Sequence, residues 1–595
     1  MAKYMIIDGN RVEFDKEKNI LDLVRKAGID LPTFCYYSEL SIYGACRMCM
    51  VEDEKGHLIA SCSTPPKDKM EIKTNTPKLH HHRKMILELI LASHCRDCTV
   101  CKKSGKCRLQ ELALRFGVEN IRFKNTKIKP PIDRSSKAIQ IDQSKCILCG
   151  DCVRMCNEVQ NVGAIDFAFR GSKMIVSPAF GKCLAETDCV GCGQCSAVCP
   201  TGAIVIKSNI KDVWKEIYDP NKRVVMQIAP AVRTALGEEF SVKPGENVMN
   251  LIAAALRRMG VDYVYDTSLG ADLTTVEESK EFMTKIEQDY KNEYEERNSN
   301  SYNDTDNNLK ADHTNDSIGN TNNKIIKYPL FTSCCPAWVK YCETKHPELM
   351  KYVSTCKSPM EMFGVVVKEY FKNKDRADNK ETISVAVMPC TAKKAEADRE
   401  EFIRDGIKDV DYVLTTSEVC AMINESGIKF NEIEAESLDM PFSLHSGAGV
   451  IFGVTGGVTE AVIRTIAEDK SQKALKEIEF IGIRGMDGVK VCEAEINERK
   501  FRIAVVSGLG NAEKIIKLIE SGEEHFDFVE VMACPGGCVG GAGQPFGFKA
   551  EKLERAKGLY KTDKVAQIKR SAENPMMNTI YKDILKGNYH LLHRK

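Results

Sequence analysis

Cys146-Ile147-Leu148-Cys149-Gly150-Asp151-Cys152-Val153-Arg154-Met155-Cys156 recurs with the same spacing as Cys189-Val190-Gly191-Cys192-Gly193-Gln194-Cys195-Ser196-Ala197-Val198-Cys199-Pro200. This internal duplication decides the fold of residues 138–208, for which we predict a domain with two [4Fe-4S] clusters. In proteins with two such cysteine runs, the fourth cysteine of each run binds the other cluster. One cluster should therefore take Cys146, Cys149, Cys152 and Cys199, and the other should take Cys189, Cys192, Cys195 and Cys156.

The composition is that of an ordinary globular protein. The chain has 595 residues, of which 43% are hydrophobic and 28% charged, and its formal net charge is +1. This length predicts four or more domains, and the balanced charge does not indicate a nucleic-acid-binding surface. The first residues lack the features of a secretory signal, and no run approaches the roughly 18 apolar residues of a membrane span. We expect a soluble, cytoplasmic monomer without a nucleic-acid or membrane partner.

The 26 cysteines indicate metal sites, because disulfides seldom persist in a reducing cytoplasm.

In residues 1–78, alternating segments at Tyr4–Asp8 and Arg11–Phe14 and a helical stretch at Ile20–Ala27 predict a small mixed sheet crossed by a helix. Four thiolates with one long loop are typical of a [2Fe-2S] cluster, and a zinc site is the alternative. The ligands would be Cys35, Cys46, Cys49 and Cys62.

Residues 79–125 carry a second type of site after a helical stretch at Lys84–Ala92. The spacing is His94-x3-Cys98-x2-Cys101-x5-Cys107. One imidazole and three thiolates could bind zinc or an iron–sulfur cluster on chemistry alone. Cys95 is out of register with this pattern and stays unassigned.

Residues 209–548 alternate apolar strand-like runs with helical stretches, which predicts an α/β domain. The strand-like runs include Val224–Ile228, Ile383–Val387 and Ile503–Val506. Within this domain, residues 292–324 are almost without apolar side chains, so we predict a mobile loop there, more a passive surface insertion than a mechanical element.

Three short motifs lie far apart in this domain: Thr332-Ser333-Cys334-Cys335-Pro336, Met388-Pro389-Cys390-Thr391-Ala392-Lys393-Lys394 and Met532-Ala533-Cys534-Pro535-Gly536-Gly537-Cys538. Together they resemble the signature of [FeFe]-hydrogenases, and the cysteine groups before them resemble the accessory clusters of the long clostridial, monomeric members. The resemblance covers nearly the whole chain apart from the insertion. It implies a ferredoxin hydrogenase, active in anaerobic hydrogen metabolism, that catalyses H2 ⇌ 2H⁺ + 2e⁻.

The resemblance also implies a multidomain α+β and α/β architecture. Its parts would be a [2Fe-2S] β-grasp ferredoxin-like domain, a His/Cys3 [4Fe-4S] domain, a bacterial two-[4Fe-4S] ferredoxin-like domain, a catalytic domain and a C-terminal segment, 549–595, like the hydrogenase small subunit. Electrons would pass through these accessory clusters to ferredoxin or a similar carrier.

In the family, the active site is the H-cluster, a [4Fe-4S] cubane linked to a two-iron unit with CO, cyanide and azadithiolate ligands, which maturation proteins supply. The resemblance implies cubane ligands Cys335, Cys390, Cys534 and Cys538, with Cys538 as the bridge. Lys393 would donate to one cyanide, and Ser358 with the backbone near Ala229 and Pro230 would serve the other. Met388, Met532 and Phe452 would pack around the two-iron unit.

Proton delivery requires an acid–base group within hydrogen-bond reach of the iron. The resemblance assigns this role to Cys334, with Glu278, Ser354 and Glu281 as onward carriers. Glu278 and Glu281 share a helix face if Thr275–Met283 is helical. The chain differs from its relatives at Ala231, Ala337, Met360 and Lys285. These differences leave every cluster ligand in place.

Three other functions compete with this prediction. A catalytic subunit of an electron-bifurcating, NADH- and ferredoxin-linked complex has a similar layout, but this chain carries no flavin or dinucleotide motif of its own. A sensory hydrogenase or a cluster-assembly homologue usually lacks Cys334 or part of the ligand set. A complex I iron–sulfur subunit would explain only residues 1–208.

Overall fold

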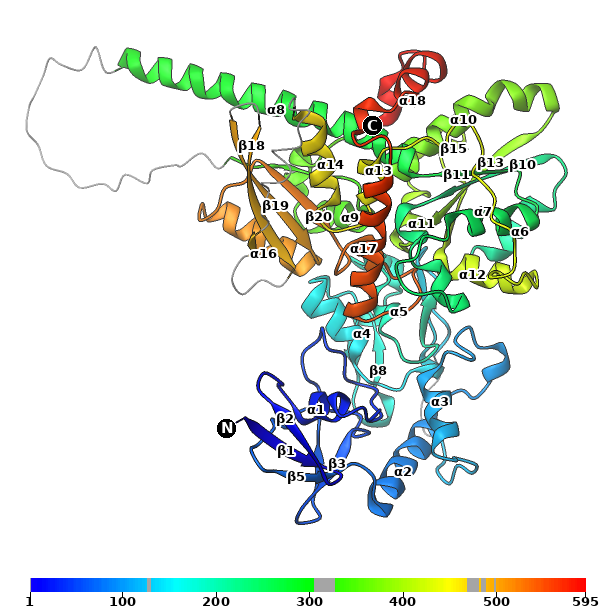
Figure 1. The fold of residues 1–595 in the computed structure, drawn as a ribbon, viewed down its shortest axis with the longest axis vertical. Coiled ribbons are helices and arrows are strands. Elements are labelled where there is room, and N and C mark those ends of the chain that lie inside the picture. The colour runs from blue at the N-terminus through cyan, green and yellow to red at the C-terminus, as the bar shows by residue number, and fades with distance from the viewer. Residues whose placement is uncertain are drawn as a thin grey trace, which may run out of the picture. The chain divides into compact units, whose positions relative to one another are not determined.

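A computed structural model of the chain describes residues 2–125, 130–303, 327–467, 481–482, 488–496 and 499–594. The chain divides into two units, Met1–Lys207 and Ser208–Lys595. Figure 1 shows the first unit in blue to cyan and the second in green to red. Among the helices of the described residues, none has both the length and the apolar character needed to cross a membrane.

The first unit begins with the predicted mixed sheet. Strands β1 (Lys3–Ile7) and β2 (Asn10–Phe14) are antiparallel, and β5 (Glu71–Lys73) pairs with β1 in parallel. The sheet order is β2-β1-β5-β3-β4, with β3 at Met50–Asp53 and β4 at Leu58–Ala60. Helix α1 (Ile20–Lys26), capped by the Asn19 side chain, buries its apolar residues in the same core as the sheet.

Helix α2 (Pro77–Ser93) is longer at its N-terminus than the predicted Lys84–Ala92. The Thr76 side chain accepts from the backbone N–H of Leu79, and Pro77 suits the first helical turn, so the helix begins seven residues earlier. Buried Arg83 donates to three backbone carbonyls and ties α2 to the sheet. Helix α3 (Arg108–Arg115) follows.

The duplicated cysteine runs adopt the same local structure twice. In each run a glycine in the left-handed region, Gly150 (φ +79°) or Gly193 (φ +68°), precedes a short helix, α4 (Asp151–Arg154) or α5 (Gln194–Ala197). Glycine takes this conformation without a Cβ clash. Antiparallel strands β6 (Ile139–Ile141) and β9 (Ile204–Ile206) flank the duplication, and β7 (Asp166–Ala168) pairs with β8 (Ile175–Ser177) inside it.

The second unit contains two sheets. The first is fully parallel in the order β11-β10-β13-β16, formed by Tyr263–Asp266, Lys222–Ile228, Glu381–Met388 and Tyr412–Thr415. Its strands are buried on both faces, as expected of a parallel sheet covered by helices. The surrounding helices are α6 (Ile210–Ile217), α7 (Met249–Arg258), α10 (Pro359–Asp378) and α12 (Thr416–Glu425).

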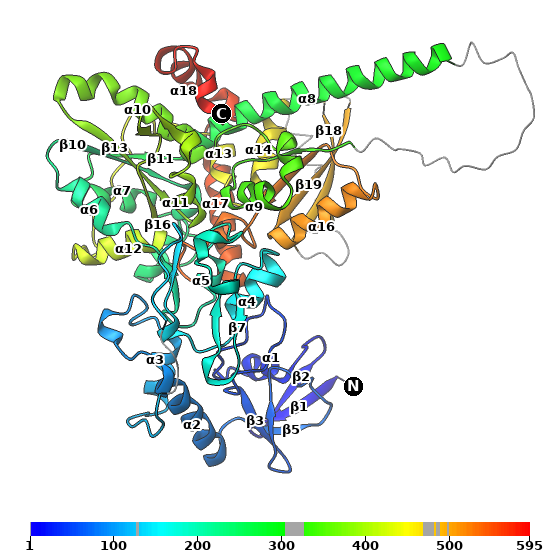
Figure 2. The ribbon, with the colours of Figure 1, turned by 180° about the vertical axis from the view of Figure 1, so that it is seen from behind.

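The second sheet has the order β12-β20-β19-β18-β17, formed by Leu330–Phe331, Phe528–Met532, Arg499–Ser507, Val489–Ile496 and Ile481–Gly482. Strands β12, β20 and β19 are parallel, and β18 and β17 are antiparallel additions. Seen from the front and from behind, α13 (Gly447–Ile451) and α17 (Lys549–Val565) lie between the two sheets (Figures 1 and 2). The predicted α/β fold is therefore confirmed.

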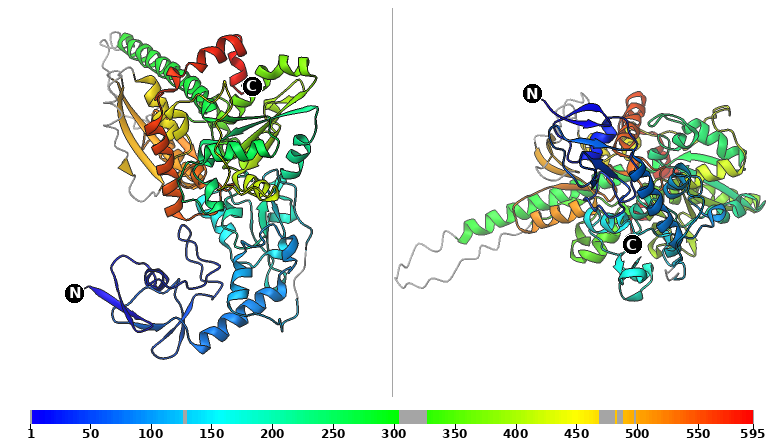
Figure 3. Two further views of the ribbon diagram at one scale, coloured as in Figure 1. Left: turned by 45° about the vertical axis from the view of Figure 1, so that its right-hand side comes forward. Right: turned by 90° about the horizontal axis from the view of Figure 1, so that it is seen from below.

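Helix α8 (Ser268–Asn303) corrects the predicted loop. The predicted helix at Thr275–Met283 is present, but the helix continues through residues 292–303, where we expected a loop (Figure 3). Glutamate and arginine at 293–297 are good helix formers, and extending an existing helix costs no new nucleation. The rest of the predicted loop, from residue 304, lies outside the described residues.

The C-terminal segment packs back onto the catalytic domain. Arg555 of α17 is buried and pairs with Glu238 at 2.6 Å. After α18 (Met576–Thr579), His593 forms an antiparallel bridge with Cys356. The tail thereby joins a segment that follows the first active-site motif in the chain.

Candidate functional site

The carboxyl ends of strands from both sheets meet around one cavity of about 80 Å³. In open α/β sheets, ligands bind outside the carboxyl ends of the strands. Each predicted motif begins where a strand ends, so the order of the sheets brings distant motifs together. Several residues that line the cavity come directly after a strand or a few residues later. They are Ala229 and Pro230 after β10, Cys334 and Cys335 after β12, Cys390 after β13, and Cys534 and Cys538 after β20.

Four predicted cluster ligands line this cavity together: Cys335, Cys390, Cys534 and Cys538. Burial raises the pKa of Cys390 to about 11 and also raises the pKa of Cys335 and Cys538. Such thiols ionise when a metal binds, because a coordinated thiol is deprotonated. Helix α9 (Pro336–Lys345) begins directly after Cys335, and α11 (Ala392–Glu396) begins two residues after Cys390.

The lining also contains the predicted packing residues. Met388, Phe452 and Met532 border the cavity, as do Ala231 and Met360, two of the departures from relatives. Ser358 lies just outside it, next to lining residue Pro359, and its buried hydroxyl has no hydrogen-bond partner within the described residues. Four thiols, soft side chains and an unsatisfied hydroxyl fit a thiolate-bound iron cluster with polar diatomic ligands.

Lys393 supplies a positive charge at the cavity. Its Nζ lies 2.6 Å from Glu396 Oε2 and 3.3 Å from the carbonyl oxygen of Cys334. Burial opposes the charge, but Glu396 outweighs it and raises the pKa of Lys393. The ammonium therefore stays charged beside the cluster ligands, as a strong donor must.

The four predicted proton carriers lie near one another. Cys334 lines the cavity. The backbone N–H of the preceding residue, Ser333, donates to Glu278 Oε1 at 3.2 Å. Burial, together with the charge of Glu281, raises the pKa of Glu278 to about 8. The Ser354 side chain helps to lower the pKa of both carboxyls, so it lies near Glu278 and Glu281.

Lys285, one of the four departures from relatives, lies further along helix α8 than Glu278 and Glu281. That side chain pairs with Asp289 on its own helix at 3.1 Å. Glu281 instead accepts from the Thr355 backbone N–H at 3.2 Å and forms an ion pair with His593 at 3.4 Å. Burial opposes ionisation of Glu281, but interactions with His593, Ser354 and Thr355 lower its pKa.

Three buried glutamates were missed in the sequence. Glu396 pairs with Lys393, and their spacing on one helix could have indicated it. Glu361 follows Ser358 by three residues, a spacing that suggests a helix cap. Both carboxyl oxygens of Glu361 nevertheless lack hydrogen-bond partners within the described residues, and burial raises the pKa of Glu361 well above normal. Glu530 accepts from the backbone N–H groups of Gly456 and Thr459 and holds the turn after Phe452.

The predicted ligands of the first unit also come together. Cys146, Cys149, Cys152 and Cys199 line one cavity of about 20 Å³. For the [2Fe-2S] group, contact with the Cys35 thiol lowers the pKa of Cys46 to about 6, and Cys62 lowers that of Cys49 to about 7.

The two remaining ligand groups are compact as well. Burial raises the pKa of Cys189 to about 11, and the charge of Cys156 adds to the effect. Burial raises the pKa of Cys107, and the charges of Cys101 and Cys98 add to the effect. His94 directly follows helix α2, at its C-terminal cap.

This architecture defines a class of protein: an iron–sulfur oxidoreductase with a four-cysteine cavity where two sheets meet and further cysteine groups in a separate unit. The family model "Iron only hydrogenase large subunit, C-terminal domain" matches residues 222–296 and 304–542. The chain therefore belongs to the iron-only, or [FeFe], hydrogenase family and is an H2-converting oxidoreductase.

Further family models match the other regions in order. They describe a 2Fe-2S cluster binding domain at 5–77, an NADH-ubiquinone oxidoreductase-G iron-sulfur binding region at 83–122, a 4Fe-4S dicluster domain at 145–203 and the iron hydrogenase small subunit at 549–594. The chain thus combines an H-cluster domain with [2Fe-2S] and [4Fe-4S] domains, as the resemblance implied.

Known relatives extend over almost the full length. The chain is 40% identical to the NADP-reducing hydrogenase subunit HndD of Solidesulfovibrio fructosivorans, over 99% of this chain and 97% of that protein. It is 34% identical to iron hydrogenase 1 of Clostridium pasteurianum, over 98% and 96%. A structure of apo [FeFe]-hydrogenase HydA1 from Chlamydomonas reinhardtii, a variant form, has a TM-score of 0.52 and 32% identity, covering 65% of this chain and 98% of its own.

Proposed function

We propose that this hydrogenase interconverts H2 with two protons and two electrons at the cavity between its sheets and exchanges the electrons with ferredoxin. Cys335, Cys390, Cys534 and Cys538 would hold the H-cluster, and the Cys538 thiolate would also attach the two-iron unit to the protein. When bound, the cluster supplies the iron at which H2 is made or split. Lys393, Ser358 and the backbone at Ala229 and Pro230 orient its polar ligands, and Met388, Phe452 and Met532 exclude water.

The protein's chemical contribution is proton transfer. The Cys334 thiol exchanges a proton with the reacting group and with Glu278, whose pKa near 8 suits a carrier at neutral pH. Burial raises the pKa of Cys334 far above normal, so the thiol stays protonated until it transfers. Ser354 and Glu281 carry the proton onward to the surface.

Electron transfer is the role of the first unit. Its proposed sites are the [2Fe-2S] group in 1–78, the His94 site in 79–125 and two [4Fe-4S] clusters in 138–208, followed by the catalytic domain at 209–548 and the tail at 549–595. We further propose a cytoplasmic monomer that receives its two-iron unit from maturation proteins.

One observation carries this function: four cysteines from three distant strand ends line one apolar cavity with the ammonium of Lys393. The test is Cys334→Ala in protein matured with the two-iron unit. This variant should retain the infrared bands of iron-bound CO and cyanide but lose most of its turnover. Cys342→Ala, a buried cysteine on α9 away from the cavity, is the matched control. Wild-type rates in Cys334→Ala would refute the relay.

A second function is favoured by one comparison. The relative with 40% identity over nearly the whole chain is named a subunit of an NADP-reducing hydrogenase. This chain could likewise be the catalytic subunit of an electron-bifurcating complex, with the flavin on a partner. Purification from the native host decides between the two functions. A flavoprotein that co-elutes and supports NAD(P)H-linked H2 turnover favours the complex. Full ferredoxin-linked turnover by the isolated chain favours the monomer.

A further inference from the structure

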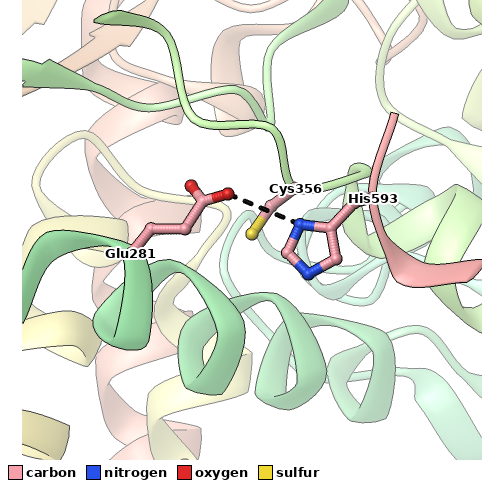
Figure 4. Close-up of side chains that lie close together, drawn as sticks. All are labelled: Glu281, Cys356 and His593. Carbon is pink, nitrogen blue, oxygen red and sulfur yellow. Dashed lines mark ion pairs between the residues drawn. The ribbon is translucent and has the colours of Figure 1, made fainter. Parts of the chain in front are cut away.

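A mixed group of metal-binding side chains lies at the outer end of the proton carriers, apart from the cluster sites. Glu281, Cys356 and His593 each offer one ligand atom, and these atoms lie within 4.8 Å of one another. Figure 4 shows the three side chains pointing toward one another from α8, from the segment before α10 and from the C-terminal tail. We propose that they form a binding site for a zinc-class divalent cation, with water in the fourth position.

The backbone holds two of the ligands in register. Cys356 and His593 face each other in an antiparallel bridge, flanked by hydrogen bonds from Lys357 N to Leu592 O (2.8 Å) and from Arg594 N to Thr355 O (2.7 Å). In this pattern the facing residues are a non-hydrogen-bonded pair, whose Cα atoms lie about 4.5 Å apart and whose side chains are closest. The cysteine and histidine are therefore adjacent without any rearrangement of the tail.

The third ligand comes from the long helix. Glu281 Oε1 lies 3.4 Å from His593 Nδ1. Thr355 Oγ1 lies 2.8 Å from the same nitrogen and also contacts Glu281, so cation binding would exchange this hydroxyl contact for a metal bond. One thiolate, one imidazole and one carboxylate are a donor set that suits Zn²⁺ better than Mg²⁺ or Ca²⁺.

A second carboxylate orients the histidine. The opposite ring nitrogen, His593 Nε2, lies 3.4 Å from Glu277 Oε2. Glu277 is fixed in turn by Lys280 at 2.8 Å and by the Tyr581 hydroxyl. Metal-binding histidines typically donate their other ring nitrogen to a carboxylate in this way, which fixes the tautomer and strengthens the ligand.

Cation binding must displace protons. Hydrogen bonds to Glu277 and Glu281 raise the pKa of His593 to about 9, and burial raises the pKa of Cys356 well above normal. One Zn²⁺ would replace the proton on His593 Nδ1 and the proton on Cys356 Sγ, which leaves the net charge of the group unchanged. Binding should therefore release two protons and weaken as pH falls.

The test is Zn²⁺ titration of the anaerobic holoenzyme. Calorimetry in two buffers of different ionisation enthalpy should show a site that releases protons, and X-ray absorption should show one Zn–S distance of about 2.3 Å. Cys356→Ser and His593→Gln should each weaken binding at least tenfold, and Glu277→Gln should weaken it about 10- to 100-fold because Glu277 orients the His593 ring. Affinity unchanged in both ligand variants, or zinc without sulfur scattering, would overturn the site.

A matched control tests whether zinc binds instead at a surface group of side chains. His346, Glu348 and Glu520 also lie close enough to share an ion, but two of these side chains are exposed. His346→Gln should leave the proton-releasing zinc site intact, and loss of that site in this variant would contradict the assignment.

One consequence rests on the proposed proton relay. Because Glu281 cannot both ligate zinc and carry protons, saturating Zn²⁺ should lower H2 turnover at least tenfold, a chelator should restore it, and His593→Gln should be insensitive. Zinc that binds with sulfur scattering but leaves turnover unchanged would support the site and refute the exit through Glu281, so the two proposals fail separately.

Discussion

The two units solve the same problem, binding clusters through cysteine, in opposite ways. In the first unit most neighbouring ligands are three or four residues apart, and short turns with left-handed glycines such as Gly150 and Gly193 position them. In the second unit the ligands follow β12, β13 and β20, which belong to two different sheets. Accessory sites therefore depend on local sequence, and the catalytic site depends on the tertiary fold.

The strongest test of this difference is removal of the proposed bridge. Cys538→Ser should abolish H2 production, because a serine oxygen is a poor substitute for the thiolate that would link the two-iron unit to the protein. The H2 formed is measured by gas chromatography. Cys492→Ala, a buried cysteine in β18 far from the cavity, should keep most of its activity. Substantial H2 from Cys538→Ser would exclude this residue as the bridge.

A smaller effect is expected from the first proton carrier on α8. Glu278→Gln should lower turnover by about 10²- to 10⁴-fold, the usual contribution of an acid–base group, while the infrared bands persist. Glu287→Gln, an exposed glutamate on the same helix, is the control.

The same residue predicts a pH dependence. The Glu278 carboxyl, with a pKa of about 8, loses its proton as pH rises through that value. Proton reduction by the wild type should therefore decline above about pH 8. An unchanged profile in Glu278→Gln would argue against this carboxyl as the titrating group.

A ligand change in the first unit should affect only part of the activity. Cys192→Ser should weaken ferredoxin-driven turnover more than turnover driven by a small viologen dye, because the dye can reduce the catalytic site without the accessory clusters. Rates with both donors are measured on the same preparation. Equal loss with both donors would mean that the first unit also supports the catalytic fold.

The smallest expected effect concerns the tail. The pKa of His593 is raised to about 9, so its ion pairs stabilise the folded state fully below about pH 6.5 and lose this contribution as pH rises through 9. With chelator present, His593→Gln should lower the Tm at pH 6 by about 1–2 °C, equivalent to about 1 kcal/mol. Calorimetry should show that the difference disappears above pH 9, and a constant difference would exclude the ion pairs as its cause.

The sequence predicted the α/β fold and the cysteine motifs because ligand spacing and strand runs are local features. The meeting of Cys335, Cys390 and Cys538 at one cavity could be inferred only from the family resemblance, since it depends on strand order. The pairing of Glu396 with Lys393 could have been predicted from their spacing on one helix.

Other features could not be predicted from local patterns. His593 reaches Glu281 through a tail bridge that no spacing indicates, and Lys285 turns to Asp289 on its own helix. The predicted loop was wrong at 292–303 because low apolar content does not by itself exclude a helix.

The central claim is that the cavity between the two sheets holds the H-cluster. Infrared spectroscopy of the full chain, matured with the two-iron unit, tests it most directly. We predict bands of iron-bound CO and cyanide that appear in the wild type and in Cys334→Ala and are lost in Cys538→Ser. Matured wild-type protein without these bands would contradict the account.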